Sequence, residues 1–120
     1  MQGQRSTDRS GGLWLIQAFS GLLLILVLGL HMIAQHFVAE GGLRDFADVL
    51  NYVSNPVIFA LEVAFLVVVT VHAMLGTRAI LLDLGLGKRN ERVVNWLILT
   101  VGVVVLAYGI WLALAIQRLA

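Results

Sequence analysis

Three long runs of apolar residues divide the chain, and short polar segments separate them. The runs extend from about residue 13 to 38, from 57 to 82 and from 93 to 116. Each exceeds the roughly 20 residues that a helix needs to cross the hydrocarbon core of a bilayer. The pattern therefore predicts an all-α fold with three tilted transmembrane helices, in one membrane domain that extends over residues 1–120.

The polar segment between the first two runs has its own pattern. Residues Leu43–Tyr52 place apolar side chains at helical spacing, which predicts a short amphipathic helix over 43–52. Asn55 and Pro56 follow it. A proline is favoured in the first turn of a helix, so this pair marks the start of the second span.

The composition agrees with a membrane protein. Of the 120 residues, 60% are hydrophobic and 12% are charged, whereas about 25% of the residues in a soluble domain are charged. This balance excludes a small soluble domain, a disordered chain and, with a net charge of +1, a nucleic-acid-binding protein. The chain has no cysteine, which excludes disulfides, thiolate metal sites and thiol nucleophiles.

The basic residues predict an orientation. Five lie in the N-terminal segment or in the second loop: Arg5, Arg9, Lys88, Arg89 and Arg92. The first loop and the C-terminal segment hold one each, Arg44 and Arg118. Because positive charge is concentrated on the cytoplasmic side of membrane proteins, we expect the N-terminus and the second loop to be cytoplasmic.

His72 is the most informative ionisable residue in the spans. It lies about 12 residues, or about 18 Å, from the inner end of the second span, too deep for an imidazole to reach water. Gly76 follows on the same face, and Arg78 lies nearer the inner interface. An axial nitrogen, space for a flat macrocycle and a cation for a propionate are what a membrane haem requires. A hydrogen bond from His72 to a neighbouring helix, with Gly76 as a packing contact, explains the same residues.

His31 lies about seven residues, or about 10 Å, from the outer end of the first span. The two histidines are therefore at different depths, so one haem cannot easily use both, whereas two haems can use one each. His36 lies at the outer interface, where an amphipathic side chain is ordinary. Glu62 is expected to extend toward the outer surface or to serve a proton path, and we interpret Gly29, Gly102 and Gly109 as contacts between helices.

Two motifs carry a resemblance to a known family. Residues 72–83 have the form H-x-x-x-G-x-R-x-x-x-x-D, and Trp14–Gly21 reads W-L-I-Q-A-F-S-G. The first motif resembles the second-helix signature of the membrane-anchor (cytochrome b) subunits of succinate dehydrogenase (complex II) and fumarate reductase. The second motif is similar to the stretch that opens the first helix of these anchors.

The resemblance implies a specific function. Two such anchors form a six-helix bundle, on which an FAD-containing flavoprotein and an iron–sulfur protein dock, and electrons from succinate pass to a quinone. His72 would then be an axial ligand of a haem b shared with the partner anchor, His31 would bind a second haem, and Arg78 would meet a propionate. Gly76 would pack against the macrocycle. We therefore expect a multi-pass subunit of a bacterial cytoplasmic (inner) membrane that is not an enzyme alone.

The chain departs from the family pattern at two positions. Ala18 replaces an arginine of the first-helix motif, and Leu84 replaces a tyrosine that often follows the aspartate. Both departures weaken the case that this chain supplies the main quinone contacts. Gln17, Ser20 and Asp83 are the candidates for the quinone vicinity, and each is equally well explained as a polar residue near a helix end.

Two other functions fit the same residues. In a small transport component, His72, Glu62 and Asp83 would relay protons or ions. In a structural anchor without haem, His72 would be a packing residue that glutamine can replace.

Overall fold

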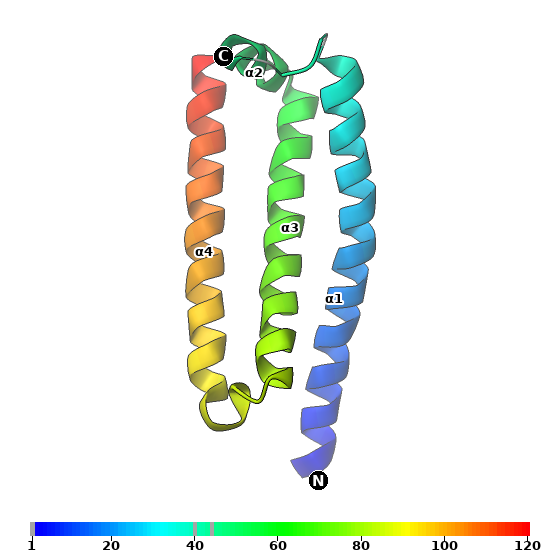
Figure 1. Cartoon of the computed structure of the whole chain (residues 1–120), viewed down its shortest axis with the longest axis vertical. Helices are drawn as coiled ribbons and strands as arrows, with labels where there is room; N and C mark the ends of the chain where they lie inside the picture. The colour runs from blue at the N-terminus through cyan, green and yellow to red at the C-terminus, as the bar shows by residue number, and fades with distance from the viewer. Residues whose placement is uncertain (1, 40, 44) are drawn as a thin grey trace.

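In the part of the chain that the structure describes, three long helices lie side by side and one short helix lies at their end (Figure 1). The computed structural model describes residues 2–39, 41–43 and 45–120, and of residues 2–10 and 87–89 it describes the backbone alone. The elements are α1 (Gln2–Ile33), the π-helical segment η1 (Ala34–Val38), α2 (Phe46–Ser54), α3 (Pro56–Asp83) and α4 (Gly87–Leu119).

The long helices confirm the predicted all-α class. α1 together with η1, α3 and α4 each contain a stretch long and apolar enough to cross a membrane. The predicted spans over 13–38, 57–82 and 93–116 all lie within them. Large apolar side chains cover the outside: Trp14 is 69%, Phe19 is 67% and Trp96 is 64% exposed. Such a surface suits lipid or other membrane helices rather than water.

The short helix begins later than the apolar pattern predicts. The expected segment over 43–52 is α2, Phe46–Ser54. The difference arises from a capping box, in which the Asp45 carboxylate accepts from the Asp48 backbone N–H and the Asp48 carboxylate accepts from that of Asp45. These reciprocal bonds satisfy two N–H groups at the helix start and fix it after Asp45.

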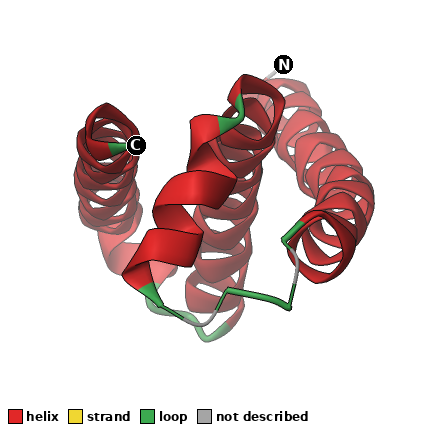
Figure 2. Ribbon diagram, turned by 90° about the horizontal axis from the view of Figure 1, so that it is seen from above, coloured by secondary structure: helices red, strands yellow, loops and turns green. Residues whose placement is uncertain are grey.

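Helix α2 closes one end of the bundle. It lies across the ends of the long helices (Figure 2). Its Tyr52 is buried in an apolar cluster with Ala34 of η1 and Ile58 of α3. At the start of α3, the Asn55 side chain accepts from the backbone N–H of Val57 at 2.9 Å. These contacts hold the turn between α2 and α3 against the end of α1.

A Schellman motif ends α3 and begins the tight connection to α4. Gly85 has φ of +79°. Its N–H donates to the Leu82 carbonyl at 3.0 Å, and the N–H of Leu86 donates to the Leu81 carbonyl at 3.2 Å. Glycine reaches this left-handed conformation without steric cost, so the chain can reverse direction directly after the last turn of α3.

Helix α3 lies between α1 and α4 and packs against both (Figure 2). On the α4 side, a Cβ at Gly102 would overlap the side chain of Met74, and one at Gly109 would lie 2.7 Å from Leu66 Cδ2. Both glycines are therefore helix contacts, as the sequence predicts. At Gly29 nothing lies within 4 Å of a Cβ, so Gly29 contacts no other helix in the described part of this chain, and its predicted helix contact stays a prediction.

The structure places at one end of the molecule the two segments that the charge pattern predicts to lie on the same side of the membrane. The start of α1 and the α3–α4 turn lie at one end, and α2 and the C-terminus lie at the other (Figure 1). Five of the basic residues that set the expected orientation lie outside the described residues: Arg44, and the side chains of Arg5, Arg9, Lys88 and Arg89. Which end faces the cytoplasm therefore stays a prediction from the sequence.

Candidate functional site

His72 lies in the seam between α3 and α1. Its Nδ1 is 3.1 Å from Oγ of Ser20 on α1. Ser20 is 7% exposed, and its hydroxyl also donates to the backbone carbonyl of Gln17 at 2.9 Å. The structure therefore joins two predicted site residues, His72 and Ser20, that stand more than fifty positions apart in the sequence.

Two glycines create the space in this seam. A Cβ at Gly21 would lie 3.1 Å from Cε1 of His72, tighter than an ordinary van der Waals contact. A Cβ at Gly76 would lie 3.1 Å from Nε2 of Gln17. Gly21 thus accommodates the imidazole, and Gly76, predicted to lie beside a macrocycle, accommodates the Gln17 amide. Gly21 stood in the first-helix motif, but its contact depends on how α1 faces α3.

Gln17 has an unsatisfied polar atom. Among the described residues, its Oε1 is a buried side-chain oxygen with no hydrogen-bond partner. A buried acceptor without a donor costs about 1–3 kcal/mol. This atom therefore suits a ligand or a neighbouring subunit that presents an O–H or N–H group at the end of the seam next to Gly76.

Arg78 points away from His72, toward α4. Its Nε donates to Oδ1 of Asn95 at 2.7 Å, and Nη2 donates to Oε1 of Glu91 at 3.2 Å. Asp83, the last residue of α3, is exposed. The structure thus does not bring Arg78 or Asp83 together with His72 and Ser20. A guanidinium has five N–H donors, and two of them hold α3 to α4 here.

His31 belongs to a second polar cluster, near the opposite end of the α1–α3 seam. Its Nδ1 lies 2.8 Å from the Glu62 carboxylate, and its ring stacks on Phe65 with centroids 4.6 Å apart. Tyr52 of α2 donates its hydroxyl proton to the same carboxylate at 2.8 Å. The cluster links α1, α2 and α3, so the Glu62 side chain faces into the seam. This differs from one of its two expected roles, in which it extends toward the outer surface.

Tyr52 is the residue that sequence reasoning missed. Burial and, secondarily, the hydrogen bond to Glu62 raise the pKa of Tyr52 well above its ordinary value. The phenol therefore stays protonated and donates to the carboxylate at any ordinary pH. The sequence did contain a signal for the pair that Tyr52 joins, because Glu62 and His31 are at similar expected depths from the outer ends of their spans.

The two histidine clusters are separate. Glu62 and His72 are ten residues apart on α3, or about 15 Å along the helix axis. His31 contacts Glu62, and Ser20 contacts His72. No group of three or more His, Asp or Glu side chains able to hold a metal ion occurs among the described residues. His36 is exposed, and its ring meets Phe37 edge-on at 5.5 Å, as expected for an interfacial residue.

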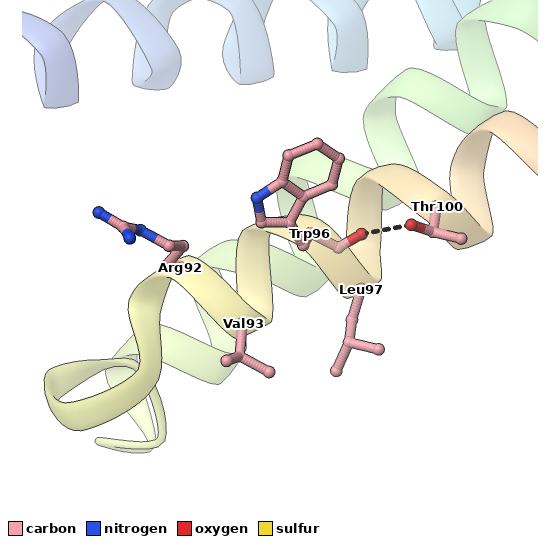
Figure 3. Close-up of a pocket in the computed structure, with 5 residues that line it drawn as sticks. All are labelled: Arg92, Val93, Trp96, Leu97 and Thr100. Carbon is pink, nitrogen blue, oxygen red and sulfur yellow. Dashed lines mark hydrogen bonds between the residues drawn. The ribbon is translucent and has the colours of Figure 1, made fainter.

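Two apolar grooves lie along α4, away from the histidines. One, of about 310 Å³, follows α4 itself and is lined by Arg92, Val93, Trp96, Leu97 and Thr100. Arg92 and Trp96 project to one side of the helix, and Val93 and Leu97 to the other (Figure 3). The second, of about 280 Å³, lies between α3 and α4 and includes Thr70, Met74 and Gly102. No histidine is among the residues that line either groove.

The comparisons identify the family. A sequence model of the succinate dehydrogenase/fumarate reductase transmembrane subunit matches residues 7–112. The chain belongs to this family. It is 36% identical over 103 residues to the succinate dehydrogenase hydrophobic membrane anchor subunit of Archaeoglobus fulgidus, which covers 86% of this chain and 87% of that relative.

A second anchor subunit, from Thermoplasma acidophilum, is 28% identical over 103 residues and covers 86% of this chain and 84% of the relative. No solved structure matches the chain. The resemblance predicted from the two motifs is confirmed, and this succinate dehydrogenase/fumarate reductase transmembrane subunit is a multi-pass membrane anchor. The matched residues include both histidine clusters, from Gln17 to His72.

Proposed function

We propose that this anchor subunit binds haem b at His72 and helps to pass electrons from succinate to a quinone. In the proposed complex, a second anchor completes a six-helix bundle, and an FAD-containing flavoprotein and an iron–sulfur protein dock on it. The observation that carries the proposal is the placement of His72: a histidine held by Ser20 inside a membrane seam of a chain of this family.

The residues around His72 fit a haem. One ring nitrogen, Nδ1, contacts Ser20, so Nε2 is the nitrogen that remains for iron. Gly21 and Gly76 keep Cβ atoms out of the seam. When bound, the haem would supply a one-electron redox centre. Arg78 would meet a propionate with the guanidinium donors that Glu91 and Asn95 do not use.

His31 is the proposed ligand of a second haem. Its Nδ1 is held by the Glu62 carboxylate, which leaves Nε2 for iron. Histidine ligands of metals commonly donate their other ring N–H to a carboxylate, which fixes the ring and makes the ligand more basic. The depth difference of about 15 Å from His72 requires two separate haems.

The quinone is proposed to bind at the Gln17 end of the seam. Gln17 and Ser20 line the seam on α1, Gln17 lies against Gly76 of α3, and Asp83 ends α3 seven residues after Gly76. Because Ala18 and Leu84 replace the arginine and tyrosine of the family pattern, the partner anchor or the iron–sulfur protein would supply the stronger polar contacts. This end would face the cytoplasm, since the basic residues lie there.

Haem content of the purified complex tests the proposal. We expect His72→Ala to remove one haem and His31→Ala to remove another, as measured by the pyridine haemochrome spectrum. His36→Ala is the matched control, because His36 is an exposed histidine of the same chain and should leave the haem content unchanged. Flavin and non-haem iron content, measured in parallel, report whether each variant complex has assembled.

The outcomes separate the candidate functions. Full haem content in an assembled His72→Ala complex overturns the assignment of His72, and full content in His31→Ala overturns the second haem. A wild-type complex without haem identifies a structural anchor. The third candidate, a relay through His72, Glu62 and Asp83, has less support, because about 15 Å of helix separates His72 from Glu62.

A further inference from the structure

The hydrogen bonds of Ser20 bear on which nitrogen of His72 carries the proton. The Ser20 hydroxyl lies 2.9 Å from the backbone carbonyl oxygen of Gln17 and 3.1 Å from His72 Nδ1. A carbonyl oxygen can only accept a hydrogen bond, and a serine hydroxyl has one proton to donate. The proton of Ser20 therefore points to Gln17, and its oxygen is left as an acceptor.

The contact with His72 must then run in the other direction. With the Ser20 proton donated to Gln17, the tautomer of His72 that matches this contact has its hydrogen on Nδ1 and donates it to the Ser20 oxygen. In a neutral imidazole only one nitrogen is protonated, so Nε2 keeps its lone pair. Donation by Ser20 to the Gln17 carbonyl polarises the hydroxyl and makes its oxygen a better acceptor.

We infer that Ser20 is a positioning residue that holds the His72 imidazole in the tautomer able to bind iron through Nε2. The inference deepens the proposed function and rests on the haem at His72. Gly21, the next residue of α1, also helps to position the His72 imidazole. Its missing Cβ lets the imidazole approach α1 closely enough for Nδ1 to reach Ser20. The two residues thus set both the position and the protonation of the ligand.

The hydrogen bond has a consequence for the redox potential. An imidazole that donates from Nδ1 carries more negative charge on Nε2, which favours ferric over ferrous iron. Removing a partner of this kind typically changes metal affinity by 10- to 100-fold. If Ser20→Ala lowers the ferric-to-ferrous affinity ratio about tenfold, the midpoint potential of the haem rises by about 59 mV for this one-electron couple.

The test uses the whole complex with four variants of this chain. We expect Ser20→Ala to retain haem, to raise its midpoint potential and to shift the low-spin EPR signal of the ferric haem. Ser20→Thr keeps a hydroxyl at the same position and should restore wild-type values. Thr70→Val is the matched control: Thr70 is also 7% exposed, but its hydroxyl donates to the Leu66 carbonyl and not to a histidine.

Each outcome decides the inference. A Ser20→Ala complex with unchanged potential and EPR signal overturns it, as does loss of haem in both Ser20→Ala and Ser20→Thr, which would make Ser20 a packing residue. Loss in Ser20→Ala alone, with wild-type values in Ser20→Thr, supports it. The fourth variant, His72→Ala, tests the proposed function separately: if it keeps its haem, the haem assignment fails first and the role of Ser20 fails with it.

Discussion

His31 and Glu62, on neighbouring helices, are joined in the membrane seam by a contact of 2.8 Å. Tyr52 approaches the same carboxylate from α2, so one side chain of α3 holds partners from two other elements. In a bilayer, apolar contacts give helices little preference for one arrangement, and polar contacts between helices supply it. The stability of the end of this anchor that carries α2 therefore depends on Glu62.

Removing the Glu62 carboxylate should destabilise the anchor. Glu62→Ala leaves Tyr52 and His31 without an acceptor, at an expected cost of about 1–3 kcal/mol. Glu91→Ala is the comparison, since Glu91 forms an exposed pair with Arg78 and such pairs contribute about 0–1 kcal/mol. Thermal unfolding of the purified complex measures both. Equal stability of the Glu62→Ala and wild-type complexes would contradict the role of Glu62.

The protonation of Tyr52 predicts a pH dependence. Its pKa is raised in the folded chain, so the unfolded chain loses this proton first, above the ordinary tyrosine pKa of about 10. Stability from Tyr52 should therefore be constant below about pH 10 and decline above it. Thermal unfolding at pH 8 and at pH 10.5 checks this. Tyr52→Phe should lose less stability over this interval than Tyr108→Phe, which removes an exposed tyrosine and leaves Tyr52 in place.

Glycine at position 102 should be required for close packing of α3 and α4. A Cβ there overlaps the Met74 side chain, so Gly102→Ala forces a repacking that costs about 1–3 kcal/mol. Met74→Ala in the same chain should restore part of the loss by removing the obstacle. Gly29→Ala is the control, because a Cβ at Gly29 meets nothing. Equal unfolding temperatures of the two glycine variants would contradict the close packing of α3 against α4 at Gly102.

Arg78 should act on the connection between α3 and α4. Arg78→Lys keeps the positive charge but cannot reach Asn95 and Glu91 together with a planar fork of donors. We expect it to lower the thermal stability of the complex, and Asn95→Ala should do so to a similar extent. Haem content, measured on both variants, separates this role from a propionate contact. Loss of haem in Arg78→Lys alone would assign Arg78 chiefly to the haem.

The transmembrane helices could be predicted from hydropathy because each apolar run exceeds the thickness of a bilayer. The importance of His72 could be predicted as well, since an ionisable group at that depth needs a partner. Its partner could not, because Ser20 meets His72 only in one register of α1 against α3. The partners of Arg78 could not be predicted for a related reason: six residues after His72, Arg78 lies on another side of α3, where α4 lies.

The polar and close contacts in the seam between α1 and α3 also favour one register of these two helices. Gln17 lies against Gly76, Ser20 against His72 and His31 against Glu62, so nearly equal steps along the two antiparallel helices connect all three pairs. A slip of α1 by one residue moves it about 1.5 Å and rotates each side chain by about 100°. All three pairs would break together, whereas the apolar surfaces of the helices around them would be little affected. A chain inserted in the wrong register would therefore leave both histidines without their partners in the membrane and Glu62 with Tyr52 alone, which makes the misaligned form the less stable one.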